Sequence, residues 1–112
     1  GRSDDSAREI VRQATTLEEL GAFAVVLECV PANLAQEITD ALRIPTIGIG
    51  ASAQCDGQVL VTEDMLGMFE RVPRFVKRYG DIAGFISATA QQYAGEVRNR
   101  TFPGEEQTYQ PK

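Results

Sequence analysis

The chain has 112 residues, of which 43% are apolar and 24% charged, with 11 Lys and Arg against 16 Asp and Glu. This length and composition are typical of one small globular domain. The net charge of −5 and the lack of a basic cluster argue against nucleic acid or an anionic membrane as a partner. The chain has no histidine, so it cannot by itself form a Ser-His-Asp site or a histidine-ligated zinc site.

The two cysteines, Cys29 and Cys55, form no CxxC pair and are too few for a disulfide scaffold. We therefore expect reduced thiols, as in the cytoplasm. The polar, acidic residues 1–5 do not resemble a signal peptide. The longest apolar run, residues 22–27, is too short to cross a bilayer.

In the first part of the chain, apolar residues recur every three or four positions over residues 6–20, which predicts an amphipathic helix. Gly21 is expected to end it. Residues 22–27 are apolar at every position, a pattern typical of a strand buried on both faces. Pro31 suits the first turn of a second predicted helix, residues 31–42.

The remaining chain contains two more predicted strands, residues 46–50 and 58–61. Two helices are expected after them, one over residues 73–79, where Pro73 precedes apolar residues at helical spacing, and one over residues 82–97. Proline and glycine indicate an irregular tail over residues 99–112.

Strands that alternate with helices predict an α/β fold with parallel strands joined by right-handed crossovers. Three strands would leave two unpaired edges, which proteins normally pair or cover. A (β/α)8 barrel uses about 250 residues, or about 31 per unit, so this chain holds between three and four units. We therefore expect the chain, apart from its tail, to be part of a (β/α)8 (TIM) barrel.

Glu28 is the first candidate catalytic residue because it follows six apolar residues at the carboxyl end of a predicted strand. Active sites of barrels and open α/β sheets lie at that edge. We expect a partly desolvated carboxylate there, suited to accept a proton. A surface glutamate, or an acceptor that caps the next helix, explains the position equally well.

Other candidates are weaker. The glycine-containing residues 48–51 lack the third glycine of a dinucleotide site, so a tight turn is the favoured interpretation. Glu63 and Asp64 are adjacent carboxylates without a third ligand, which do not specify a metal site, and a solvated loop is favoured. Asp56 and Gly57 are typical of a turn.

Four motifs resemble the ketopantoate hydroxymethyltransferase family, in its order and spacing: VLECVP (residues 26–31), IPTIGIGA (residues 44–51), DGQVLV (residues 56–61) and FPGEE (residues 102–106). The resemblance covers nearly the whole chain but only the C-terminal part of the family. Ser52 stands where the family tends to have glycine.

The resemblance implies that residues 1–98 are C-terminal βα units of a (β/α)8 barrel with a terminal helix, in an enzyme of pantothenate and coenzyme A biosynthesis. That family transfers a hydroxymethyl group from 5,10-methylenetetrahydrofolate to 3-methyl-2-oxobutanoate and gives 2-dehydropantoate. The motif places the family's proton acceptor at Glu28. The family's Mg²⁺ ligands and substrate-binding lysine are expected upstream of this chain, so no metal or cofactor ligand is assigned within it. The family also implies a homo-oligomer in which the C-terminal helix contacts another subunit.

Three functions therefore stay open at this point. The chain is a transferase segment that needs the missing N-terminal barrel part and is inactive alone. Alternatively, it is a catalytically incomplete barrel fragment that acts only as an association module, or a phosphoenolpyruvate-mutase-like carbon–carbon lyase.

Overall fold

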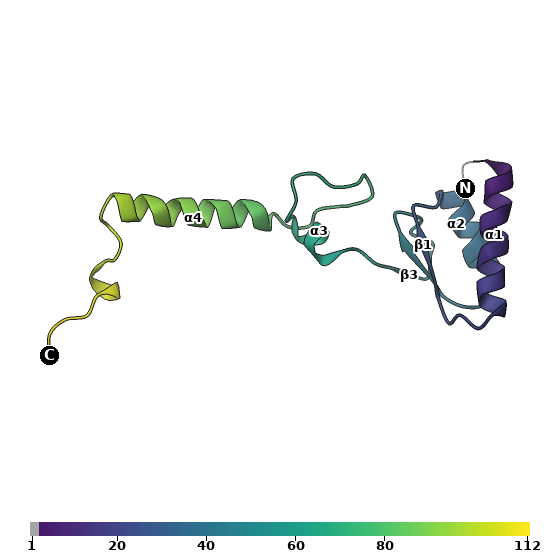
Figure 1. Cartoon of the computed structure of the whole chain (residues 1–112), viewed down its shortest axis with the longest axis horizontal. Coiled ribbons are helices and arrows are strands. Elements are labelled where there is room, and N and C mark those ends of the chain that lie inside the picture. Colours follow the sequence, from purple (N-terminus) through teal and green to yellow (C-terminus); the bar gives the residue numbers. More distant parts are fainter. Residues whose placement is uncertain (1–2) are drawn as a thin grey trace.

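A three-stranded parallel sheet lies at the N-terminal end of the molecule, as seen in the computed structural model, which describes residues 3–112 (Figure 1). The strands are β1 (Val25–Glu28), β2 (Thr46–Ile49) and β3 (Gly57–Gln58), and β2 lies between the other two. Val25 pairs with Thr46, and Ile47 pairs with Gly57. The predicted α/β class and the parallel direction of the strands are confirmed. Residues 3–112 form an open sheet and not a closed barrel.

Two helices, α1 (Asp4–Glu19) and α2 (Ala32–Ala41), pack against each other, and α2 packs against the sheet. The first helix starts two residues earlier than the sequence predicts because Ser3 is its N-cap. The Ser3 hydroxyl accepts a hydrogen bond from the backbone N–H of Ser6 at 3.2 Å, which satisfies one free donor of the first turn.

The core lies between the helices and one face of the sheet. Its buried apolar residues are Ala14, Val25, Leu27, Leu34, Ala35, Ile38 and Cys55. Along β1 the burial alternates, so Val25 and Leu27 are buried while Val26 is 57% exposed. The prediction that this strand is buried on both faces is therefore wrong for this chain. Residues 3–112 supply a helical layer for one face only.

Polar groups connect the strands at their amino ends. Thr46, the first residue of β2, is fully buried, and its backbone N–H donates to the Asp56 carboxylate at 2.9 Å. Its hydroxyl also shares a hydrogen bond of 2.8 Å with the Thr39 hydroxyl on α2. Asp56 precedes β3 directly, so this cluster fixes where β3 starts beside β2.

After β3 the structure differs from the prediction. The helix expected over residues 73–79 is absent, and a short helix, α3 (Thr62–Leu66), forms earlier. Residues 67–81, here named the α3–α4 loop, turn back toward the sheet (Figure 1). The loop closes because the Met65 carbonyl accepts hydrogen bonds from the backbone N–H groups of Tyr79 and Gly80. Those bonds and a single turn at Pro73–Val76 replace the predicted helix.

The last helix, α4 (Ile82–Arg98), extends away from the sheet (Figure 1). None of its residues is buried. Its apolar side chains include four that are exposed: Phe85, Ile86, Tyr93 and Val97. The chain then turns back, and the ring of Phe102 packs edge-on against Tyr93 at 5.4 Å before a short 3-10 helix, Glu105–Gln107. Among residues 3–112, no helix has both the length and the apolar character needed to cross a bilayer.

Candidate functional site

The carboxyl ends of β1 and β2 turn sharply at the same edge of the sheet. Cys29 follows β1 with φ 55°, and Gly50 follows β2 with φ 65°. The Cys29 N–H still donates to the Ile49 carbonyl at 2.9 Å, so the two strands stay paired up to this edge. Residues after strands of parallel sheets commonly form the ligand site. The tight turn that we predicted over residues 48–51 forms only at Gly50 and Ala51, because residues 48 and 49 still belong to β2.

Glu28 is the last residue of β1 and pairs in register with Ile49. It alternates with the buried Leu27, so it projects from the same face as Val26, the face that the helices leave uncovered. Glu28 is exposed, and within residues 3–112 its carboxylate has no hydrogen-bond or ion-pair partner. The expected partial desolvation is therefore wrong for this chain, because nothing described here covers that face.

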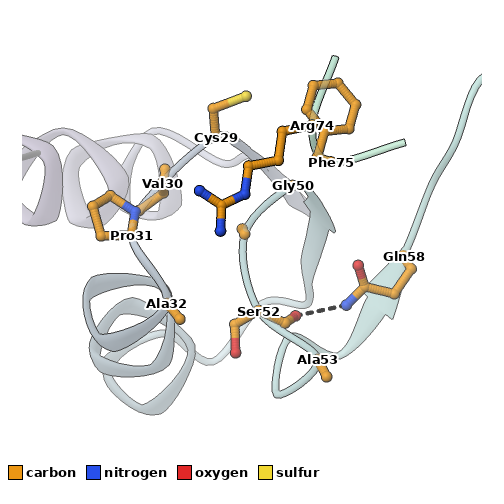
Figure 2. Close-up of a pocket in the computed structure, with 11 residues that line it drawn as sticks. Cys29, Val30, Pro31, Ala32, Gly50, Ser52, Ala53, Gln58, Arg74 and Phe75 are labelled. Carbon is orange, nitrogen blue, oxygen red and sulfur yellow. Dashed lines mark hydrogen bonds between the residues drawn. The ribbon is translucent and has the colours of Figure 1, made fainter. Parts of the chain in front are cut away.

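A hollow of about 940 Å³ opens beside these strand ends. Its walls come from the β1–α2 connection, the β2–β3 connection and the tip of the α3–α4 loop (Figure 2). The lining residues are Cys29, Val30, Pro31, Ala32, Gly50, Ala51, Ser52, Ala53, Gln58, Arg74 and Phe75. Glu28 is not among them, although Cys29, its neighbour in the chain, is.

The α3–α4 loop brings Arg74 to this hollow. Arg74 and Phe75 occupy the turn at the loop tip, and Phe75 packs against Gly50. Figure 2 shows the Arg74 guanidinium pointing into the space between the Val30–Pro31 segment and Gly50. The sequence alone does not single out Arg74, because the spacing of residues 73–79 predicts a helix for this segment. No local pattern connects Arg74 with Gly50, which lies 24 positions earlier in the chain.

Hydrogen bonds order the opposite wall of the hollow. The Gln58 side-chain amide donates to the Ser52 carbonyl at 2.7 Å (Figure 2), and the Ser52 hydroxyl accepts from the backbone N–H of Gln54 at 3.0 Å. Ser52 therefore has a role in shaping this turn.

The remaining acidic candidates are separate from the hollow. Glu63 and Asp64 lie in the first turn of α3 and not in the expected loop. Negative charge is favourable in this turn because it lies near the helix N-terminus. Asp56 binds Thr46 at the opposite ends of the strands. Within residues 3–112, no group of three or more His, Cys, Asp or Glu side chains is arranged to hold a metal ion. Cys29 and Cys55 are both free thiols.

Comparison with known proteins decides the family. The profile of the family described as Ketopantoate hydroxymethyltransferase matches residues 1–105. The chain belongs to this family. Curated relatives named 3-methyl-2-oxobutanoate hydroxymethyltransferase include those of Erythrobacter litoralis and Novosphingobium aromaticivorans, each 68% identical over all 112 residues. The Sphingopyxis alaskensis relative is 61% identical over 109 residues, or 97% of the chain.

The chain spans 39% of the length of the first two relatives and 38% of the third. Within the ketopantoate hydroxymethyltransferase family, the chain therefore corresponds to only a part of the length of each of these relatives. The predicted resemblance to this family is therefore confirmed.

Proposed function

We propose that this chain is the C-terminal part of a ketopantoate hydroxymethyltransferase and supplies Glu28 as the proton acceptor. The substrates are 3-methyl-2-oxobutanoate and 5,10-methylenetetrahydrofolate, and the product, 2-dehydropantoate, leads to pantothenate and coenzyme A. The observation that carries the proposal is the position of Glu28. The chain belongs to this family, and Glu28 is the last residue of β1, at the carboxyl edge of the sheet. Its side chain projects from the uncovered sheet face.

The chemistry needs a base at one carbon of the oxo acid. Glu28 accepts the proton from C3 of 3-methyl-2-oxobutanoate, and the electrons of that C–H bond form the enolate. Water breaks both C–N bonds of the donor's methylene group, so that tetrahydrofolate leaves and the methylene carbon becomes formaldehyde. C3 of the enolate then bonds to that carbon, and the oxygen on that carbon takes up the proton that Glu28 accepted. A carboxylate held at a fixed strand end is suited to this transfer because its position is set before the substrate binds.

The family implies a Mg²⁺ ion, but the described residues do not fit one. Glu28 stands alone at its strand end, and no group of three potential ligands forms within residues 3–112. We therefore propose that the ligands lie upstream in the barrel. On this proposal the isolated chain, assayed with Mg²⁺ and both substrates, gives no measurable turnover. The alternative association module gives none either, so the test needs the missing part.

The decisive experiment is a chimeric enzyme. This chain replaces the matching 39% of the Erythrobacter litoralis relative, to which it is 68% identical. We expect the chimera to convert both substrates to 2-dehydropantoate. Glu28→Gln in the chimera should lower kcat by about 10²- to 10⁴-fold, the usual contribution of a positioned base, with smaller changes in KM.

Glu37→Gln is the matched control, because Glu37 is an exposed residue on α2 and the same charge is removed. It should leave kcat unchanged. Circular dichroism and gel filtration show whether each protein is folded. A folded chimera without turnover, or a Glu28→Gln chimera with full turnover, would contradict the proposal.

Two further parts of the proposal concern the surroundings of the enzyme. We propose that another copy of the chain covers the exposed apolar side chains of α4. We propose that the upstream barrel part covers the uncovered sheet face with Val26. The free thiols Cys29 and Cys55 accord with the reducing cytoplasm, where we propose the enzyme acts.

A further inference from the structure

The hollow at the strand ends has the charge of a binding site for an anion. Among its described lining residues Arg74 is the single charged one, although the whole chain has a net charge of −5. Within residues 3–112, the Arg74 guanidinium has no hydrogen-bond or ion-pair partner. Its N–H donors are therefore available to a ligand in the hollow.

The position of Arg74 is fixed by its neighbour. Phe75 packs against Gly50, and the loop that carries both residues is closed at its base by hydrogen bonds to the Met65 carbonyl. Arg78 on the same loop donates to the Glu70 carbonyl, so that arginine serves the loop itself. Arg74 is instead directed into the hollow (Figure 2).

A second wall of the hollow favours negative charge as well. Pro31 and Ala32 are the N-cap and first residue of α2, a helix of 10 residues with no acidic residue in its first turn and no side-chain cap. The N-terminus of such a helix carries partial positive charge and free N–H groups. Arg74 and this helix end therefore act on the same space.

We propose that Arg74 binds a carboxylate group of a substrate at this hollow, a role that rests on the function proposed above. A guanidinium can donate two parallel N–H bonds to one carboxylate, and this geometry suits planar recognition of that group. Two substrates provide a carboxylate: 3-methyl-2-oxobutanoate, and the glutamate tail of the folate donor. Glu28 would act on C3, and Arg74 would hold a substrate in place.

The test uses Arg74→Gln in the chimeric enzyme, with KM measured separately for each substrate. We expect KM for one of the two to rise about 10- to 100-fold, as when a charge-assisted hydrogen bond to a carboxylate is lost, with much less change in kcat. The substrate whose KM rises identifies the source of the carboxylate. Arg74→Lys should restore part of the affinity, because it keeps the charge but not the paired donors.

Arg71→Gln is the matched control, since Arg71 is exposed on the same loop and does not line the hollow. It should leave both KM values unchanged. Calorimetric binding of 3-methyl-2-oxobutanoate and of tetrahydrofolate to the same proteins provides a readout that needs no turnover. If Arg74→Gln loses its circular dichroism signal, Arg74→Lys replaces it and should give a smaller loss of affinity.

Unchanged affinities for both ligands, in kinetics and in calorimetry, would overturn the role of Arg74. A folded chimera that binds ligand through Arg74 but has no turnover would instead overturn the proposed function and leave the carboxylate site standing. The two failures are therefore separate results.

Discussion

A β-carbon added to Gly50 would lie 2.8 Å from both the Cβ and the Cγ of Phe75. Gly50 also has φ 65°, a backbone conformation that residues with a side chain rarely adopt. The end of β2 and the tip of the α3–α4 loop therefore meet at a position where a side chain does not fit.

Gly50→Ala is expected to destabilise the fold or displace the loop tip. The backbone strain alone costs about 1–3 kcal/mol, and the clash with Phe75 adds to that cost. Gly95→Ala is the control, because Gly95 lies in α4 with nothing within 4 Å of an added Cβ. That change should stabilise the helix by about 0.5–1 kcal/mol. Urea unfolding checks both, and equal effects would contradict the contact between Gly50 and Phe75.

Asp56→Ala should lower the free energy of unfolding by about 1–3 kcal/mol. The change leaves the backbone N–H of the fully buried Thr46 without its acceptor. Asp40→Ala removes a carboxylate from the exposed surface of α2, where Gln36 is its one hydrogen-bond donor among residues 3–112, and should cost less than about 0.5 kcal/mol. Thermal unfolding compares the two variants. A cost for Asp56→Ala as small as that for Asp40→Ala would show that the bond to Thr46 contributes nothing.

Leu34→Ala is expected to cost about 2–5 kcal/mol, because Leu34 is 3% exposed and its removal opens a cavity between α2 and the sheet. Leu20→Ala makes the same change at a position that is 79% exposed, and its effect should stay within about 0.5 kcal/mol. Chemical denaturation measures both. Similar losses in the two variants would contradict the location of the core.

Phe85→Ser should lower the oligomeric mass of the chimeric enzyme if α4 is a subunit contact. Phe85 is 70% exposed on a helix with no buried residue, so the change should leave the fold of the sheet intact. Light scattering coupled to gel filtration measures the mass, and circular dichroism monitors the fold. A variant of unchanged mass would remove Phe85 from the proposed contact.

The N-terminal helix should respond weakly to acid through Glu9. Hydrogen bonds from Arg12 and Gln13 hold the pKa of the Glu9 carboxyl below its ordinary value of 4.5. The stabilisation from this carboxylate is therefore present above that pH and is lost as the pH falls through the lowered pKa. Glu9→Gln should be slightly less stable than the parent chain at pH 7, and the difference should vanish at strongly acidic pH. Thermal unfolding at a series of pH values checks this, and a difference that persists in acid would be the contrary result.

Much of the fold follows from local patterns. The spacing of apolar residues predicted α1, α2 and α4, and uninterrupted apolar runs located β1 and β2. These elements are long enough for periodicity to identify them. Glu28 was found in the same way, since its strand end is visible as the point where an apolar run stops.

The features that the sequence did not predict depend on contacts between distant residues. α3 has five residues, too few for a periodic pattern. The segment that starts at Pro73 has the spacing of a helix, but its Phe75 packs against Gly50 and its end is tied to Met65. The bond between Thr46 and Asp56 joins two strand starts ten positions apart. The exposure of Glu28 depends on the missing cover of its sheet face, which no local pattern reports.

The radius of gyration is 24.0 Å, whereas a compact domain of this length has about 13 Å. Among the described residues, the outer edges of β1 and β3 have no neighbouring strand. On the proposed function, the upstream polypeptide closes a barrel and pairs with both edges, so docking at one edge alone leaves the other edge unpaired. We therefore expect the proposed enzyme, made as two separate polypeptides, to reassemble in an all-or-none manner.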